Sequence, residues 1–138
     1  MATAIRWAHA LPGVNKIKVV GLGSGGPLSM CAVALLRTVG HSAAHPNVLT
    51  LCADLSQMNG SDESFTSHLF VPGIRKAGDL RMAATLMAPV PLTIGGAKEL
   101  PSSWLEWMQQ AYRYAGDAKV FATADSADFP ESMSYPDS

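Results

Sequence analysis

The 138-residue sequence has little charge of either sign and no long hydrophobic run. Charged residues make up 15% of the chain and leave a net charge of −1, so the clustered Lys and Arg side chains that replace counterions on nucleic acid are missing. We therefore expect no nucleic-acid partner. No apolar run reaches the roughly 18 residues that a membrane-spanning helix needs, and the chain does not begin like a signal peptide. We expect a soluble protein with no membrane partner, cytoplasmic by default.

Cysteine and histidine are scarce. Cys31 and Cys52 are the only cysteines and show no C-x-x-C spacing, so we expect buried free thiols rather than a disulfide or a metal pair. The chain has four histidines, none of them after His68. His41 and His45 could join Asp54 around a metal ion, but their spacing matches no metal-binding motif. We expect neither a metal ion nor a cofactor.

Hydrophobic residues form 48% of the chain, and their pattern alternates between strands and helices. This alternation predicts βαβ units and an α/β fold, a three-layer αβα arrangement around a mostly parallel sheet of about four strands. We expect one domain over residues 1–124 and an acidic, flexible tail over residues 125–138. The expected strands cover residues 17–22, 47–53, 90–94 and 119–123, and the expected helices cover residues 2–10, 28–39, 79–87 and 104–115.

Local signals set some of these boundaries. Ser103 and Glu106 have the spacing of a capping box, Gly116 marks the end of that helix, and Asp79 is the expected N-cap of the helix before it. Residues 56–67 are polar and predict a long connection, in which Asp62 and Glu63 form a solvated pair.

The last expected helix carries an apolar stripe. Helical spacing places Trp104 and Met108 in the core, whereas Trp107 lies off the stripe and is the better candidate for an interface. A sugar-stacking role for these residues is the alternative interpretation.

The most informative segment is residues 16–27, KIKVVGLGSGGP, in which a strand leads through a glycine-rich turn into a helix. It matches the dinucleotide pattern G-x-G-x-x-G, with Gly21, Gly23 and Gly26 as candidate cofactor-binding residues. Asp54 would be the acid that binds the ribose, although it follows Gly26 by 28 residues. Pro27 removes one amide that a phosphate could use.

The same turn nearly matches the nucleophile elbow G-x-S-x-G, in which a serine stands on a sharp strand-to-helix turn. Gly23 occupies the serine position, and Ser24 follows one residue late. Making Ser24 the nucleophile puts Leu22 where a small residue is wanted. A third interpretation is that the glycines only let the helix pack tightly on the sheet, with nothing bound.

A catalytic triad in the chain order Ser24, Asp54, His68 is conceivable. His68 would have to fold over the turn from the long connection, so an ordinary surface histidine is the simpler interpretation.

Three segments carry a further signal: residues 11–27 (LPGVNKIKVVGLGSGGP), residues 70–80 (FVPGIRKAGDL) and residues 87–96 (MAPVPLTIGG). Together they resemble the C-terminal half of an α/β-hydrolase of the acetylxylan-esterase and dienelactone-hydrolase-like group, over roughly residues 10–124. The resemblance implies a partial α/β-hydrolase fold whose first strands lie outside this chain. A partial sheet exposes an edge, so we expect a homo-oligomer or a complementing chain.

The chain departs from this pattern at each catalytic position. Gly23 stands where the nucleophile belongs, residues 95–99 read GGAKE where the acid is expected, and residues 125–129 read DSADF where a Gly-His pair is expected. We therefore expect an esterase-related domain that has lost catalysis and acts as a non-catalytic or interaction module. The alternatives are a carboxylic-ester hydrolase that uses Ser24 on a small ester or carbohydrate ester, and a nucleotide-binding Rossmann-like half-domain.

Overall fold

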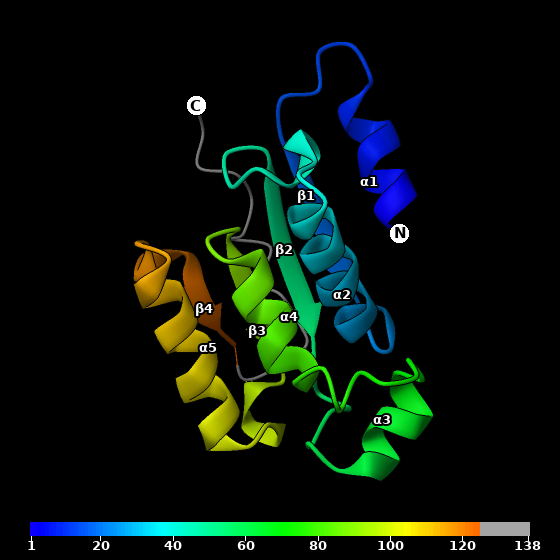
Figure 1. The fold of residues 1–138 in the computed structure, drawn as a ribbon, viewed down its shortest axis with the longest axis vertical. Helices are drawn as coiled ribbons and strands as arrows, with labels where there is room; N and C mark the ends of the chain where they lie inside the picture. The colour runs from blue at the N-terminus through cyan, green and yellow to red at the C-terminus, as the bar shows by residue number, and fades with distance from the viewer. Residues whose placement is uncertain (125–138) are drawn as a thin grey trace.

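The sheet at the centre of the fold has four parallel strands in the order β1-β2-β3-β4, as seen in a computed structural model that describes residues 1–124 (Figure 1). The expected tail, residues 125–138, lies outside the described residues. The predicted α/β class and four-stranded parallel sheet are confirmed. The strands are β1 (Ile17–Gly21), β2 (Leu49–Asp54), β3 (Leu92–Gly95) and β4 (Phe121–Thr123).

Three helices connect successive strands: α2 (Gly25–Thr38), α4 (Asp79–Met87) and α5 (Ser102–Tyr114). They lie side by side over one face of the sheet, with α4 between the other two (Figure 1). Right-handed crossovers produce this arrangement, because a sheet whose strand order follows the chain places every connecting helix on the same side. The described residues thus supply the sheet and one helical layer of an α/β fold.

The remaining helices lie at the margins. α1 (Ala2–His9) packs beside α2 through its buried Ile5, and α3 (Asp62–His68) lies beyond the carboxyl ends of the strands (Figure 1). Three single-turn helices, Ser42–Ala44, Ala97–Glu99 and Ala118–Val120, complete the described elements. No helix within residues 1–124 is long and apolar enough to cross a bilayer.

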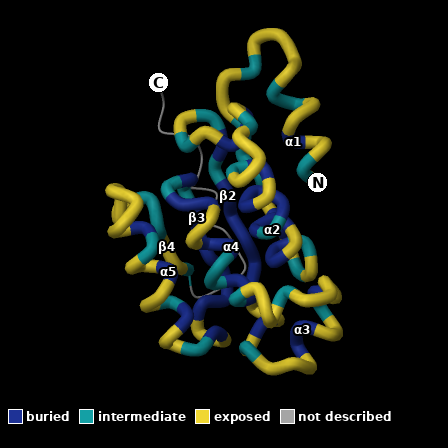
Figure 2. Tube along the Cα trace, in the orientation of Figure 1, coloured by how far each residue is buried: buried dark blue, intermediate teal, exposed yellow. Residues whose placement is uncertain are grey.

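The core lies between the sheet and the helical layer (Figure 2). Tyr112 is fully buried, and its hydroxyl donates to the carbonyl of Val90 at 2.6 Å. Trp104 and Met108 are buried as predicted, whereas Trp107 is half exposed and donates its indole N–H to the Thr85 hydroxyl. The largest fully buried side chains include Met30, Leu36, Leu51, Leu80, Met87, Leu92 and Ile94.

The prediction of a long connection over residues 56–67 is wrong for its second half, because the chain forms α3 there. The missed signal is Ser61, whose hydroxyl accepts from the amide of Ser64 at 3.1 Å and so caps the helix. Asp62 and Glu63 occupy the first helical turn, where negative charge is favourable. Asp62 also forms an ion pair with Arg75 at 3.0 Å. Asp62 and Glu63 are therefore helical residues and not a pair in a loop.

Two predicted caps are also wrong. α5 begins at Ser102 after Pro101, so Ser103 lies inside the helix and no capping box forms. The N-cap of α4 is Gly78 and not Asp79, which is the first helical residue and has a φ of +56°. The Asp79 carboxylate accepts from the amide and side chain of Arg81, and these bonds hold its left-handed backbone.

All four strands are shorter than expected, and β3 and β4 each begin two residues late. β3 begins at Leu92 because Pro91, which has no amide to donate, immediately precedes it. β4 begins at Phe121 because residues 118–120 form a single helical turn, in which the Asp117 carboxylate accepts from the amide of Lys119. The predicted end of α5 is confirmed, since Gly116 follows the helix with a φ of +92°.

Candidate functional site

The candidate site is the turn that joins β1 to α2. Gly23 lies at its apex with a φ of +52°, a region that glycine enters without steric cost. The Gly25 amide donates to the carbonyl of Leu22 at 2.9 Å, and the Gly26 amide donates to the carbonyl of Gly23 at 3.0 Å. These two bonds close the turn and start the helix.

Close packing explains two of the glycines. A Cβ on Gly26 would overlap the backbone carbonyl of Asp54, and a Cβ on Gly21 would overlap the carbonyl of Gly25 and the hydroxyl of Ser29. The start of α2 therefore lies directly against the ends of β1 and β2. Tight helix packing alone accounts for these two positions.

Asp54 fixes the turn from the neighbouring strand. The register pairs Gly21 with Ala53, which places Asp54 beside the turn at the end of β2. Its carboxylate accepts from the amide of Gly23 at 2.9 Å and from the amide of Ser56 at 2.9 Å. Burial by itself would raise the pKa of Asp54, but the hydrogen bonds from Ser56 and Gly23 outweigh it and lower the pKa below its ordinary value.

These bonds bear on the dinucleotide interpretation. The structure brings Gly21, Gly23, Gly26 and Asp54 together, as that interpretation requires. However, the amides of Gly23 and Gly26 already donate within the chain, as does that of Gly25. A phosphate on this turn would have to displace those bonds and approach the Asp54 carboxylate, whose negative charge repels it.

The three residues of the conceivable triad are not joined. Ser24 is exposed at the N-cap of α2, and its hydroxyl makes no capping bond. His68 is the last residue of α3, and no hydrogen bond within residues 1–124 connects it to Ser24 or Asp54. The Asp54 carboxylate is occupied by backbone amides. The described residues therefore contain the turn and the acid without a hydrogen-bonded base.

The space at Gly23 is open. An ideal Cβ on this residue would meet only the amide oxygen of Gln57, at 3.8 Å. Ser56 and Gln57, which lie two and three residues after the end of β2 at Asp54, were not identified from the sequence. The apex has room for a side chain and carries none.

No group of three His, Cys, Asp or Glu side chains within residues 1–124 lies close enough together to hold a metal ion. His41 and His45 flank the single-turn helix Ser42–Ala44, and Asp54 makes its bonds at the glycine turn. Neither Cys31 nor Cys52 forms a disulfide within residues 1–124; Cys52 is buried as predicted, whereas Cys31 is only partly buried. Burial raises the pKa of both thiols.

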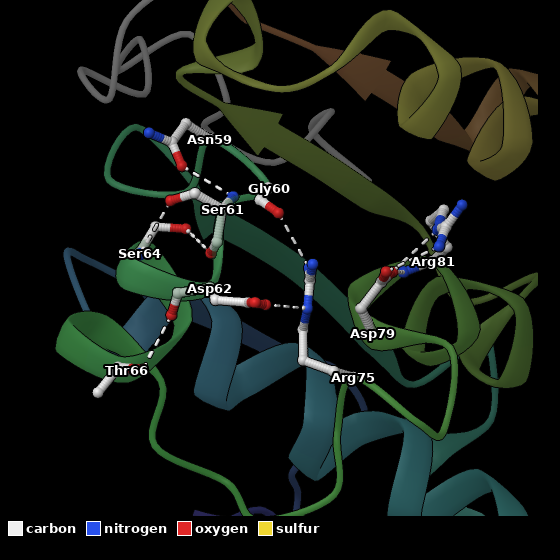
Figure 3. A network of polar contacts seen from close by, with 9 residues as sticks. All are labelled: Asn59, Gly60, Ser61, Asp62, Ser64, Thr66, Arg75, Asp79 and Arg81. Carbon is white, nitrogen blue, oxygen red and sulfur yellow. Dashed lines mark hydrogen bonds and ion pairs between the residues drawn. The ribbon is translucent and has the colours of Figure 1, made fainter.

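A separate shallow cavity of about 380 Å³ lies between α3 and residues 69–76. Arg75 is held beside it by an ion pair with Asp62 and by a hydrogen bond to the carbonyl of Gly60, both at 3.0 Å (Figure 3). The Arg75 guanidinium also lies over the ring of Phe65. The cavity is not lined by Ser24, Asp54 or His68. It is therefore distinct from the glycine turn.

Comparisons with known proteins add no assignment: neither a protein-family model nor a curated protein nor a solved structure matches the chain.

Proposed function

We propose that this chain is an α/β-hydrolase-like, esterase-related domain that has lost catalysis and acts as an interaction module. The observation that carries the proposal is Gly23 at the apex of the strand-turn-helix. A hydrolase of this kind presents its nucleophile from that apex, where the next amide and a second donor can receive the oxyanion. Gly23 has the positive φ and the open space of such a position but no side chain.

The surroundings of the turn support the same conclusion. A serine becomes a nucleophile only when a base within hydrogen-bond reach removes its proton. The Ser24 hydroxyl has no such partner within residues 1–124, and Asp54 is committed to two backbone amides. Asp54 stabilises the turn through these two bonds, and this structural role does not require catalysis.

Hydrolysis of p-nitrophenyl acetate by the purified chain tests the loss of catalysis. We expect no rate above the spontaneous one, and no difference between the wild type and Ser24→Ala. Ser103→Ala, a change of another exposed serine, controls for non-specific acceleration by the protein surface. Hydrolysis that Ser24→Ala abolishes and Ser103→Ala leaves intact would overturn the proposal in favour of an esterase.

Titration with NAD tests the nucleotide alternative. Because the turn amides are occupied, we expect no saturable binding by calorimetry. Saturable binding that Gly23→Val removes would favour a nucleotide-binding half-domain, since a side chain at the apex would block the approach of the pyrophosphate.

A further inference from the structure

We propose that the shallow cavity between α3 and residues 69–76 binds a small carboxylate with an apolar body, and that Arg75 and Lys76 receive the carboxylate group. The inference goes beyond the proposed function, because this cavity is distinct from the glycine turn. Its volume of about 380 Å³ lies within the range of small-molecule sites, which begins at about 300 Å³.

Most of the cavity wall is apolar. Phe65 and Leu69 supply buried parts of it, whereas Phe70, which also lines the cavity, is 77% exposed. The other apolar residues of the wall are Val71, Pro72 and Ile74. A ligand with an apolar body would remove this surface from water, which is favourable.

The charged residues of the wall determine the sign of the ligand. Within the part of the chain that the structure describes, they are Asp62, Arg75 and Lys76. Asp62 and Arg75 form an ion pair with each other, so Lys76 contributes the excess positive charge. The Lys76 ammonium makes no ion pair or hydrogen bond within residues 1–124. An anion with a single negative charge, such as a carboxylate, complements this wall.

Arg75 is already positioned to receive the anion (Figure 3). Its Nε pairs with Asp62, its Nη1 donates to the carbonyl of Gly60, and its guanidinium lies 4.7 Å from the centre of the Phe65 ring. These contacts leave Nη2 without a partner within residues 1–124. A guanidinium that is held in this way loses little freedom on binding, and its hydrogen bonds to a carboxylate are strong because both groups are charged.

A positively charged ligand fits this cavity less well. The ring of Phe65 could attract a cation, but the Arg75 guanidinium already lies over that ring. The Asp62 carboxylate has Arg75 as its ion-pair partner. Lys76 would repel a second positive charge.

The loop that carries both cations is held by its own hydrogen bonds. The amide of Ile74 donates to the carbonyl of Val71 at 3.2 Å. The amide of Ala77 donates to the carbonyl of Gly73 at 3.0 Å, and Gly73 has a φ of +83°, which glycine adopts without strain. The cavity is therefore formed before a ligand arrives, as most small-molecule sites are.

Titration of the full chain with hydrocinnamate, a phenyl ring on a short carboxylate, tests the inference. The amide NMR signals of the isotope-labelled protein report where the ligand binds. We expect saturable shift changes at α3 and residues 69–76, and none at the glycine turn. Hydrocinnamide has the same shape without the charge and should bind about tenfold more weakly. Acetate has the charge without the apolar body and should bind more weakly by about tenfold or more.

Two pairs of variants locate the site. Lys76→Gln removes the unpaired charge and should weaken hydrocinnamate binding about threefold. Lys119→Gln changes an exposed lysine outside the cavity and should leave binding unchanged. Phe70→Ala removes part of the apolar wall and should weaken binding about fivefold. Leu35→Ala, on α2, is its control, because Leu35 is also an exposed apolar residue. All four side chains are exposed, so we expect each variant to fold, and its amide spectrum shows this directly.

Four results would each overturn the inference. They are the absence of saturable shift changes up to the solubility limit of hydrocinnamate, shift changes that lie away from α3 and residues 69–76, equal affinity for hydrocinnamate and either control ligand, and binding that neither Lys76→Gln nor Phe70→Ala weakens. None of them bears on the loss of catalysis, which the ester-hydrolysis assay tests separately.

Discussion

The carboxylate of Asp54 accepts a hydrogen bond from the amide of Gly23 at 2.9 Å, although the two residues are 31 positions apart in the chain. This bond ties the apex of the β1–α2 turn to the end of β2. A second bond, from the amide of Ser56, anchors the same carboxylate on its own strand. Asp54 thereby holds the β1–α2 turn against the end of β2.

Replacement of Asp54 should reveal this role as a dependence of stability on pH. The folded pKa lies below the ordinary value, so the carboxylate stabilises the fold above the unfolded pKa of about 3.9, and this contribution disappears as the pH falls below it. We expect Asp54→Asn to cost about 2 kcal/mol of unfolding free energy at pH 7, and less at pH 3. Urea unfolding at several pH values measures the difference.

Glu106→Gln is the control for that measurement, since it removes one exposed negative charge and no hydrogen bond to the turn. A loss of stability in Asp54→Asn that is equally large at pH 3 and pH 7 would contradict the role assigned to the charged carboxylate.

Adjacent glycines in the turn should respond differently to alanine. A Cβ on Gly26 overlaps the carbonyl of Asp54, and relief of that overlap requires α2 to move away from the sheet. We expect Gly26→Ala to cost about 3 kcal/mol or more, or to prevent folding. A Cβ on Gly25 would meet no atom within 4 Å. We therefore expect Gly25→Ala to leave the free energy of unfolding unchanged or to raise it by up to about 1 kcal/mol. Thermal unfolding followed by circular dichroism compares the two, and equal effects would exclude the packing explanation.

The buried hydroxyl of Tyr112 offers a third test. It donates to the carbonyl of Val90 at 2.6 Å, and its burial raises the pKa of the phenol. Tyr112→Phe keeps the ring but leaves the carbonyl without this donor, which should cost about 1 to 2 kcal/mol in chemical denaturation. Tyr114→Phe, on the exposed side of the same helix, should change nothing measurable. A neutral Tyr112→Phe would mean that the Val90 carbonyl finds another partner.

The cap of α3 can be compared with the capping box that was predicted for α5. Ser61→Ala removes a side chain that accepts from the amide of Ser64, and we expect a loss of about 1 kcal/mol. Ser103→Ala should change the unfolding free energy by less than about 0.5 kcal/mol, because Ser103 lies inside α5. A larger loss of stability for Ser103→Ala than for Ser61→Ala would instead support the predicted capping box. Urea denaturation at neutral pH suffices for both.

Local chemistry in the sequence determined the class of this fold and most of its elements. Apolar runs separated by glycine and proline predicted the four parallel strands, and helical spacing placed Trp104 and Met108 in the core. The same local signals misplaced some boundaries. Pro91 moved the start of β3, and the polar run after β2 concealed α3, whose start is marked by Ser61 and by the acidic residues of its first turn.

Only the tertiary structure shows how the glycine turn is held. The pattern G-x-G-x-x-G by itself is compatible with bound phosphate, with a nucleophile elbow and with plain packing. The sequence cannot reveal the contacts around the turn, because they join residues about 30 positions apart: the Asp54 carboxylate with the Gly23 amide, and the Asp54 carbonyl with the space beside Gly26. The order of the strands likewise decided that α2, α4 and α5 share one face and that, within residues 1–124, β1 forms an edge, since pairing between distant strands is a property of the folded chain.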